Sequence, residues 1–209
     1  MDCKLISVEN TESLRNNLAD NIAQAYSVLG MRESFLVLAK DMITQKNECF
    51  ACFDDNGLSE VLSFIENEGL LRIEEAKSEL VNFGLTVQQM LGIEKMEFPQ
   101  DCEPYNKEMF EGKQGKELKE RLKMAVIKNR SYARTVVKKA QKLLHTRELA
   151  LASNTDEEKE LEYNDSFNFR YLLNINAIFA KSSADSKLVD MLVEQISLSK
   201  SNKPQEMGE

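Results

Sequence analysis

Residues 116–152 read KELKERLKMAVIKNRSYARTVVKKAQKLLHTRELALA and contain neither glycine nor proline. Because these two residues are the strongest helix breakers, their absence over so long a stretch predicts one continuous helix. Apolar side chains, with one asparagine among them, recur at alternating steps of four and three, the spacing that places residues on one helix face. The members of this heptad-like seam are Leu118, Leu122, Ala125, Asn129, Tyr132, Val136, Ala140 and Leu143.

A second apolar line widens this stripe along the same helix. A wide stripe is typical of a helix that packs in a bundle, whereas an isolated two-stranded coiled coil needs only a narrow seam. The long helix is therefore predicted to be a packing element. The second line consists of Val126, Ala133, Val137 and Leu144.

The composition of the whole chain agrees with a helical protein. Only three prolines and no tryptophan in 209 residues are more typical of a helix-rich protein than of a sandwich or barrel, and eight glycines are few for the tight turns of an all-β fold. We therefore predict an all-α fold, an irregular multi-helix bundle with one long basic helix (about 116–152) and at most a short extended segment near 48–53. The other predicted helices are 14–29 ending at Gly30, 32–44, 59–67 ending at Gly69, 71–83 ending at Gly84, 86–91, 166–181 and 184–198.

Two segments interrupt the helical periodicity. Residues 47–57 (NECFACFDDNG) end in Asp55-Asn56-Gly57, a turn signal. Residues 92–115 contain two prolines and three glycines, which indicates a connection between two parts. The predicted organisation is an N-terminal helical bundle (1–91), a connecting segment (92–115), a C-terminal helical region with the long basic helix (116–198) and a disordered tail (199–209).

Positive charge is concentrated in one sixth of the chain. Residues 113–147 hold twelve basic and two acidic residues, a net charge of +10, whereas the rest of the chain carries −18. Six of the basic residues follow steps of mostly four and seven, so they lie along one helix face or drift slowly around it. They are Lys119, Lys123, Arg130, Arg134, Lys138 and Lys142.

Like charges at these spacings repel each other by a few tenths of a kcal/mol per pair. Such a row suits a negatively charged partner, and the phosphate backbone of a nucleic acid is the leading candidate. Hydrogen bonds to phosphate or base could come from Asn129, Ser131, Tyr132 and Thr135. Two other interpretations stay open: the row could pair with acidic helices of this chain or of a partner, or it could simply be solvated.

The sequence thus favours a non-enzymatic, helical nucleic-acid-binding accessory subunit of a larger assembly, with DNA and RNA both open. The alternative is a protein–protein adaptor or structural subunit whose basic helix docks on an acidic protein surface. A protein partner or a homo-oligomer is expected in either case. No apolar run approaches the length of a membrane span, and residues 1–14 do not resemble a signal peptide, so a cytoplasmic location without membrane contact is expected.

Cys49 and Cys52 are weak candidates for zinc, because two intervening residues let two thiolates share one tetrahedral ion. Completion of the site would need Cys3 and Cys102, each of which stands alone. Phenylalanines next to the pair favour buried, structural cysteines. The expectation is therefore that no metal is bound.

No catalytic motif, cofactor or small-molecule substrate is indicated. His145 is the only histidine and is expected on the surface of the basic helix. Phosphate-binding glycine loops and nucleophile elbows are absent from the sequence. Helical carboxylates keep a metal-dependent hydrolase as a remote third possibility, and they are Glu74, Glu75, Glu79, Glu157, Glu158, Glu160 and Glu162.

Overall fold

The computed structural model describes residues 8–91, 105–152 and 170–201, and every regular element in these ranges is helical. This confirms the all-α prediction. The elements are α1 (Val8–Thr44), η1 (Glu48–Phe50), α2 (Asp55–Phe64), η2 (Ile65–Gly69), α3 (Leu70–Leu91), η3 (Lys107–Met109), α4 (Gly115–Ala152), a helical segment at 170–181, and α6 (Ala184–Ser201). In these ranges no helix combines the length and hydropathy that a membrane crossing requires.

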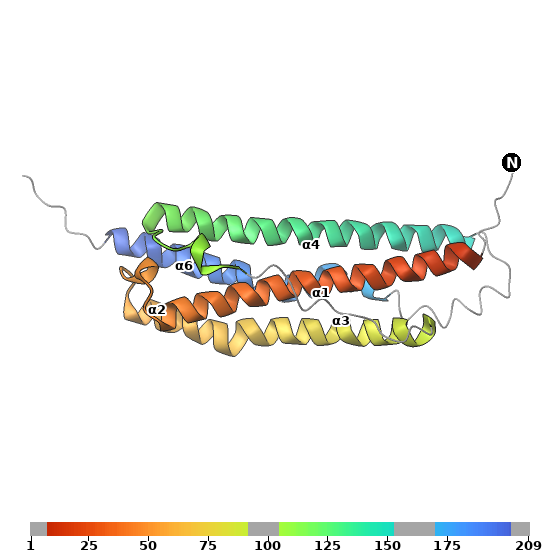
Figure 1. Ribbon diagram of the computed structural model, residues 1–209, viewed down its shortest axis with the longest axis horizontal. Helices are drawn as coiled ribbons and strands as arrows, with labels where there is room; N and C mark the ends of the chain where they lie inside the picture. The colour runs from red at the N-terminus through yellow and green to blue at the C-terminus, as the bar shows by residue number, and fades with distance from the viewer. Residues whose placement is uncertain (1–7, 92–104, 153–169, 202–209) are drawn as a thin grey trace, which may run out of the picture.

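The helices form an elongated bundle in which α1 lies between α3 and α4 (Figure 1). Both of these neighbours run antiparallel to α1, and α6 packs against α4 and α1. A single hydrophobic core joins residues from both sides of 92–104. Its fully buried members include Ile22, Leu29, Leu36, Ile73, Leu80, Leu118, Ile175 and Leu188.

The long helix α4 is confirmed, and so is most of its seam. Six of the eight predicted seam residues are buried, and Leu143 is half-buried. The prediction is wrong for Tyr132, which is 46% exposed, while its neighbour Ala133 is buried. A strict heptad assumes 3.5 residues per turn, whereas a straight helix has 3.6, so the buried stripe drifts away from the heptad positions.

The predicted helix end at Gly30 is wrong, because α1 continues through it to Thr44. Buried side chains lie on both sides of this glycine: Leu29 before it, and Met31 and Arg32 after it. A glycine inside a helix costs about 1 kcal/mol relative to alanine. Packing of both halves of α1 against α3 and α4 outweighs that cost.

Residues 48–53 contain a 3₁₀ helix, η1, and not the predicted extended segment. The side chain of Asn47 caps η1 by accepting a hydrogen bond from the backbone N–H of Cys49 at 3.0 Å. Phe50 and Phe53 meet edge to face, with 5.2 Å between their ring centroids. The predicted turn at 55–57 is likewise the first turn of α2.

Gly69 and Gly84 do not end helices either, since α2, η2 and α3 form one helical path over residues 55–91. The predicted short helix at 86–91 is the last part of α3. Gly69 ends the π-helical turn η2, and a Cβ added there would lie 2.5 Å from Cδ2 of Leu36. This glycine is therefore explained by the close approach of α1.

The C-terminal helices agree with the prediction where the structure describes them. Residues 170–181 are helical, and α6 reaches Ser201, three residues into the segment predicted as a disordered tail. The predicted helix start at 166 and the tail residues 202–209 lie outside the described residues, as does most of the predicted connection, 92–104. Residues 105–115 contain η3 and two buried aromatic side chains, Tyr105 and Phe110.

We expect Gly69→Ala to destabilise the protein by about 1–3 kcal/mol, because overpacking forces buried side chains off their preferred rotamers. Leu36 is fully buried and has little room to yield. Urea unfolding followed by circular dichroism would measure the change. In a double-mutant cycle, Leu36→Ala should make the Gly69→Ala substitution less costly. Equal costs in both backgrounds would show that contact with Leu36 is not the reason for the glycine.

Candidate functional site

The six predicted basic residues of α4 form what we call the basic face: Lys119, Lys123, Arg130, Arg134, Lys138 and Lys142. All but the half-buried Lys119 are exposed. The opposite face of α4 is buried, because α1 and α6 pack against it. The amphipathic pattern of the sequence thus directs this row of cations to solvent.

No basic-face residue forms an ion pair with any acid in the described part of the chain. Several cations on other helices, by contrast, form ion pairs with nearby carboxylates. Two lysines at the start of α4 also pair with glutamates on their own helix. The pairs are Lys40–Glu66 at 2.9 Å, Arg72–Glu68 at 2.9 Å, Lys187–Glu68 at 3.2 Å, Lys77–Glu33, Lys113–Glu117 at 3.4 Å and Lys116–Glu120 at 4.0 Å.

This contrast bears on the hypothesis that the basic face pairs with acids of its own chain. The described acids supply no such pairing. The acidic stretch at 155–165 lies outside the described residues. The basic-face cations therefore form no ion pair with the described acids, although the charge of Arg130 interacts with that of Asp185.

Apolar side chains interrupt the basic face near its start. Met124 is 60% exposed and Ile127 is 53% exposed, and they lie one helical turn apart. Tyr132 is also exposed, on a different flank of α4. Met124 and Ile127 thus place two large apolar side chains among the exposed cations of α4.

Of the four predicted hydrogen-bonding residues, Asn129 cannot serve. It is fully buried, and its amide is engaged with α1, so the prediction that it reaches a phosphate or base is wrong. Ser131 and Thr135 are exposed, although the Thr135 hydroxyl donates to the Ser131 carbonyl oxygen at 3.1 Å. His145 is exposed as expected, with Nδ1 3.9 Å from Oε2 of Glu148.

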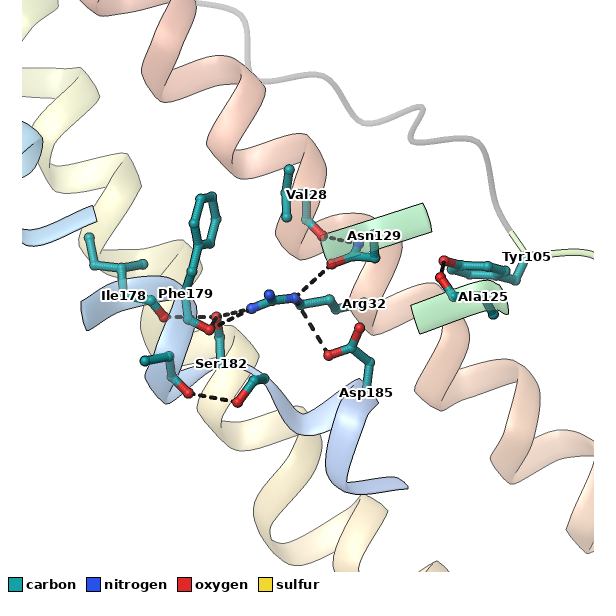
Figure 2. A network of polar contacts seen from close by, with 11 residues as sticks. Val28, Arg32, Tyr105, Ala125, Asn129, Ile178, Phe179, Ser182 and Asp185 are labelled. Carbon is teal, nitrogen blue, oxygen red and sulfur yellow. Dashed lines mark hydrogen bonds and ion pairs between the residues drawn. The ribbon is translucent and has the colours of Figure 1, made fainter. Parts of the chain in front are cut away.

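Asn129 belongs to a buried polar layer centred on Arg32 of α1 (Figure 2). Arg32 is only 3% exposed, and its guanidinium donates to three acceptors. Nε donates to Oδ1 of Asn129 at 2.9 Å, and Nη1 donates to the Phe179 carbonyl oxygen and to Oγ of Ser182, both at 2.8 Å. The Asn129 amide nitrogen in turn donates to the Val28 carbonyl oxygen at 3.1 Å.

Asp185 supplies the negative charge of this Arg32 layer. Its Oδ1 lies 3.6 Å from Nε of Arg32, and this atom has no hydrogen-bond partner among the described residues. Burial raises the pKa of Asp185, and the charges of Arg32 and Arg130 oppose that rise. Burial also lowers the pKa of Arg32, against the attraction of Asp185. The two charges are therefore costly to bury and depend on each other.

The Arg32 layer ties together α1, α4, residues 170–181 and the start of α6. Because Asn129 must face Arg32, the layer fixes the rotation of α4 and hence the direction of its basic face. Tyr105 closes one side by donating its hydroxyl to the Ala125 carbonyl oxygen at 2.8 Å. Burial, followed by the charge of Asp185, raises the pKa of Tyr105 to about 12, so it remains a donor at neutral pH.

A second buried polar contact lies further along the bundle. Tyr171 is fully buried, and its hydroxyl donates to Oδ1 of Asn21 at 2.9 Å. Asn21 donates to the Val136 carbonyl oxygen of α4 at 3.1 Å. Burial raises the pKa of Tyr171. Both contacts join α1 to α4 through an asparagine, so α4 is held in register at two levels.

Sequence reasoning missed Arg32 and Asp185, and its only usable signal was Asn129. An asparagine within an otherwise apolar seam is typical of a buried polar contact that specifies register. The identity of its partner could not be read from the pattern, because Arg32 is distant in sequence. Arg32 also follows Gly30 closely, where the helix was predicted to end.

The cysteine pair lies in two different environments. Cys49 is buried, and its thiol donates to the Phe110 carbonyl oxygen at 2.9 Å, whereas Cys52 is exposed. Burial raises the pKa of Cys49, which disfavours the thiolate that zinc requires. Among the described residues, no three histidines, cysteines or acids are grouped to hold a metal ion. Cys3 and Cys102 lie outside those residues.

An open groove of about 630 Å³ lies at one end of the bundle, between the η1–α2 region and the last turns of α6. Three acids line it, together with the exposed Cys52. Its charge suits a cation more than an anion, so it does not extend the basic face. The acids are Asp54, Glu60 and Glu194.

No known family, curated protein or solved structure matches this chain.

We expect Arg32→Met to cost about 3–5 kcal/mol at neutral pH, because it leaves the Asp185 carboxylate buried without its cation. Loss of that cation raises the pKa of Asp185 further. When a carboxyl group has a higher pKa in the folded state than in the unfolded state, the protein becomes less stable as the pH rises towards the folded-state pKa. The cost should therefore be smaller near pH 4 than at pH 7, measured by urea unfolding at both values.

Asp185→Asn provides the matched control for this experiment. Added to Arg32→Met, it removes the buried charge and should recover much of the stability at pH 7. It should also flatten the dependence on pH. A cost for Arg32→Met that is unchanged between the two pH values would contradict the charge argument.

Proposed function

We propose that this protein is a non-enzymatic nucleic-acid-binding accessory subunit, which contacts phosphates through the basic face of α4. One observation carries the proposal: five of the six basic-face cations are exposed, and none of the six forms an ion pair with an acid among the described residues. Several cations elsewhere in the described chain are paired. A row of unpaired Lys and Arg side chains suits a polyanion, because each phosphate contact releases condensed counterions.

The rigid setting of α4 supports the same proposal. The buried seam and the Arg32 layer hold the helix in one orientation, so binding would not have to order the backbone that carries the cations. The helix rises 1.5 Å per residue, so the 24 residues of 119–142 span roughly 35 Å. This length accommodates several consecutive phosphates.

The same geometry argues for binding without sequence specificity. Helices that read base edges enter the major groove, which requires a protruding helix. Here one face of α4 is packed against α1 and, over part of its length, against α6. Its outward side presents mainly long basic chains, which position a nucleic acid through its backbone and do not read its sequence.

We expect the triple change Arg130→Gln, Arg134→Gln and Lys138→Gln to weaken binding roughly a hundredfold or more at low salt. Each lost phosphate contact should also reduce the slope of log affinity against log salt by about 1. Fluorescence anisotropy with labelled DNA and RNA at several salt concentrations would measure both effects. Helix α4 should remain folded, because all three side chains are exposed, although loss of the Arg130 charge raises the pKa of Asp185 further.

A matched control removes three exposed cations from other parts of the molecule: Lys46→Gln, Lys107→Gln and Lys181→Gln. It changes the net charge equally and should leave binding nearly unaltered. Failure of the wild-type protein to bind any nucleic acid at low salt would refute the proposal. Unfolding of the basic-face variant would instead indicate that these cations pair within the chain.

The second candidate function is an adaptor whose α4 docks on an acidic protein surface. The exposed Met124 and Ile127 favour it, because apolar anchors surrounded by charge are typical of protein interfaces. Polyglutamate of matched charge tests this candidate by competition. The adaptor would be favoured if polyglutamate displaces the nucleic acid at equal concentration of charge, and if the double substitution Met124→Ser and Ile127→Ser reduces this displacement.

A further inference from the structure

We propose that the basic face also docks on anionic membrane surfaces, with Met124 and Ile127 inserting between the lipid headgroups. This function goes beyond nucleic-acid binding and does not depend on it, although phosphate groups are ligands in both. The expectation of no membrane contact came from the lack of a membrane-spanning segment, and binding at the surface of a bilayer requires none.

Ile127 lies within the basic face of α4. It follows Lys123 by four residues and precedes Arg130 by three, spacings that place side chains next to each other on a helix surface. Met124 precedes Ile127 by three residues, and the two side chains are 60% and 53% exposed. No large apolar side chain in the described part of α4 is more exposed. A surface that contacts these cations therefore meets Ile127 and, one helical turn away, Met124.

The helix carries no acid over most of its length. Residues 121–147 contain neither aspartate nor glutamate, and at 1.5 Å per residue they span about 40 Å. Glu120, the last acid before this stretch, is paired with Lys116 at 4.0 Å. An anionic surface would therefore meet no negative side chain of α4 over this distance.

The shape of the bundle suits a flat partner. Figure 1 shows α4 as a nearly straight helix along one edge of the bundle, with α1 between it and α3. A plane can touch such a helix along much of its length, whereas a helix and a duplex, which are both convex, touch over a short distance. Helix α3 carries Glu74, Glu75 and Glu79 on the far side of α1. An anionic membrane would repel that side and attract α4, which favours one orientation of the bundle.

Peripheral membrane binding generally needs two signals, and α4 supplies both. Each Lys or Arg close to an anionic surface raises the affinity roughly fivefold. The two apolar side chains add a contribution from burial, and a flexible methionine adapts to disordered acyl chains. A protein interface needs a larger apolar core with shaped pockets. A long row of cations with a small apolar pair therefore favours a bilayer over a protein partner.

Flotation of the full chain with lipid vesicles tests the contribution of charge. We expect binding to phosphatidylcholine vesicles that contain about 30% phosphatidylserine, and none to phosphatidylcholine alone. About 0.5 M salt should abolish it, because screening at that concentration is strong. The triple glutamine variant of Arg130, Arg134 and Lys138 should bind roughly a hundredfold more weakly. The matched variant of Lys46, Lys107 and Lys181 should bind like the wild type.

Fluorescence tests the insertion of the apolar pair. Because the chain contains no tryptophan, a single substitution provides a unique reporter. Emission of the Ile127→Trp variant should shift to shorter wavelength on anionic vesicles, since its indole ring leaves water. Leu71→Trp is the matched control, because Leu71 is 51% exposed and lies on α3, away from the basic face. Its emission should not change, and circular dichroism would verify that both variants are folded.

A serine variant separates insertion from phosphate contact. The double substitution Met124→Ser and Ile127→Ser should weaken vesicle binding about tenfold or more, because it removes the apolar contribution. It should leave the affinity for nucleic acid unchanged. An equal loss for both ligands would overturn insertion of the apolar pair.

Other outcomes would overturn membrane docking as a whole. These are a lack of binding to anionic vesicles at low salt, equal binding to neutral vesicles, and tighter binding of polyglutamate than of vesicles at equal concentration of charge. An unchanged emission of vesicle-bound Ile127→Trp, or an equal shift of Leu71→Trp, would show that another face docks. Titration of the wild type with nucleic acid tests the proposed function separately, so either function can fail while the other stands.

Discussion

A buried arginine imposes strict requirements on the helices around it. The guanidinium of Arg32 is always charged and carries five donors, so each helix that packs over it must supply an acceptor or lose stability. Asn129, Phe179, Ser182 and Asp185 meet this requirement from α4, residues 170–181, the following turn and α6. Apolar packing alone would tolerate many rotations of α4, but the hydrogen bond to Asn129 tolerates few. The polar contact thereby provides specificity, whereas the core provides most of the stability.

The external face of α4 follows from that internal constraint. With Asn129 turned inward, the basic-face residues must turn outward, and their mutual repulsion is offset by burial of the opposite stripe. Repulsion of a few tenths of a kcal/mol per pair is small beside the roughly 1.5–3 kcal/mol gained by burying a leucine or valine side chain. The free energy gained by burying one face of α4 therefore exceeds the repulsion among the like charges on the other face. An isolated helical arm would have the same repulsion without this gain.

Local pattern predicted α4 and the all-α class well, because a 38-residue helix is specified by periodicity within its own sequence. The predicted helix ends at glycines were wrong because the role of a glycine can depend on contacts with distant parts of the chain. Gly69 was interpreted as a helix end, whereas its role depends on Leu36 of another helix, and no local rule contains that contact. Tyr132 was assigned to the core by a heptad rule that drifts on a straight helix. Arg32 and Asp185 carry no periodic signal, and their pairing joins residues 153 positions apart.

An acidic chain can present a basic surface to a polyanion because electrostatic forces in salt water are short-ranged. The Debye length at physiological ionic strength is about 8 Å, slightly less than the diameter of one helix with its side chains. In the bundle, α1 lies between α4 and the acids of α3, so a phosphate on the basic face is more than one helix diameter from them (Figure 1). Screening weakens that distant repulsion more than the direct contacts with the cations. Lowering the salt strengthens both the attraction of phosphates to the cations and their repulsion by distant acids. The charge of −18 outside residues 113–147 therefore opposes binding most at low ionic strength. Under the proposed function, a nucleic acid would therefore approach from the side that α4 presents.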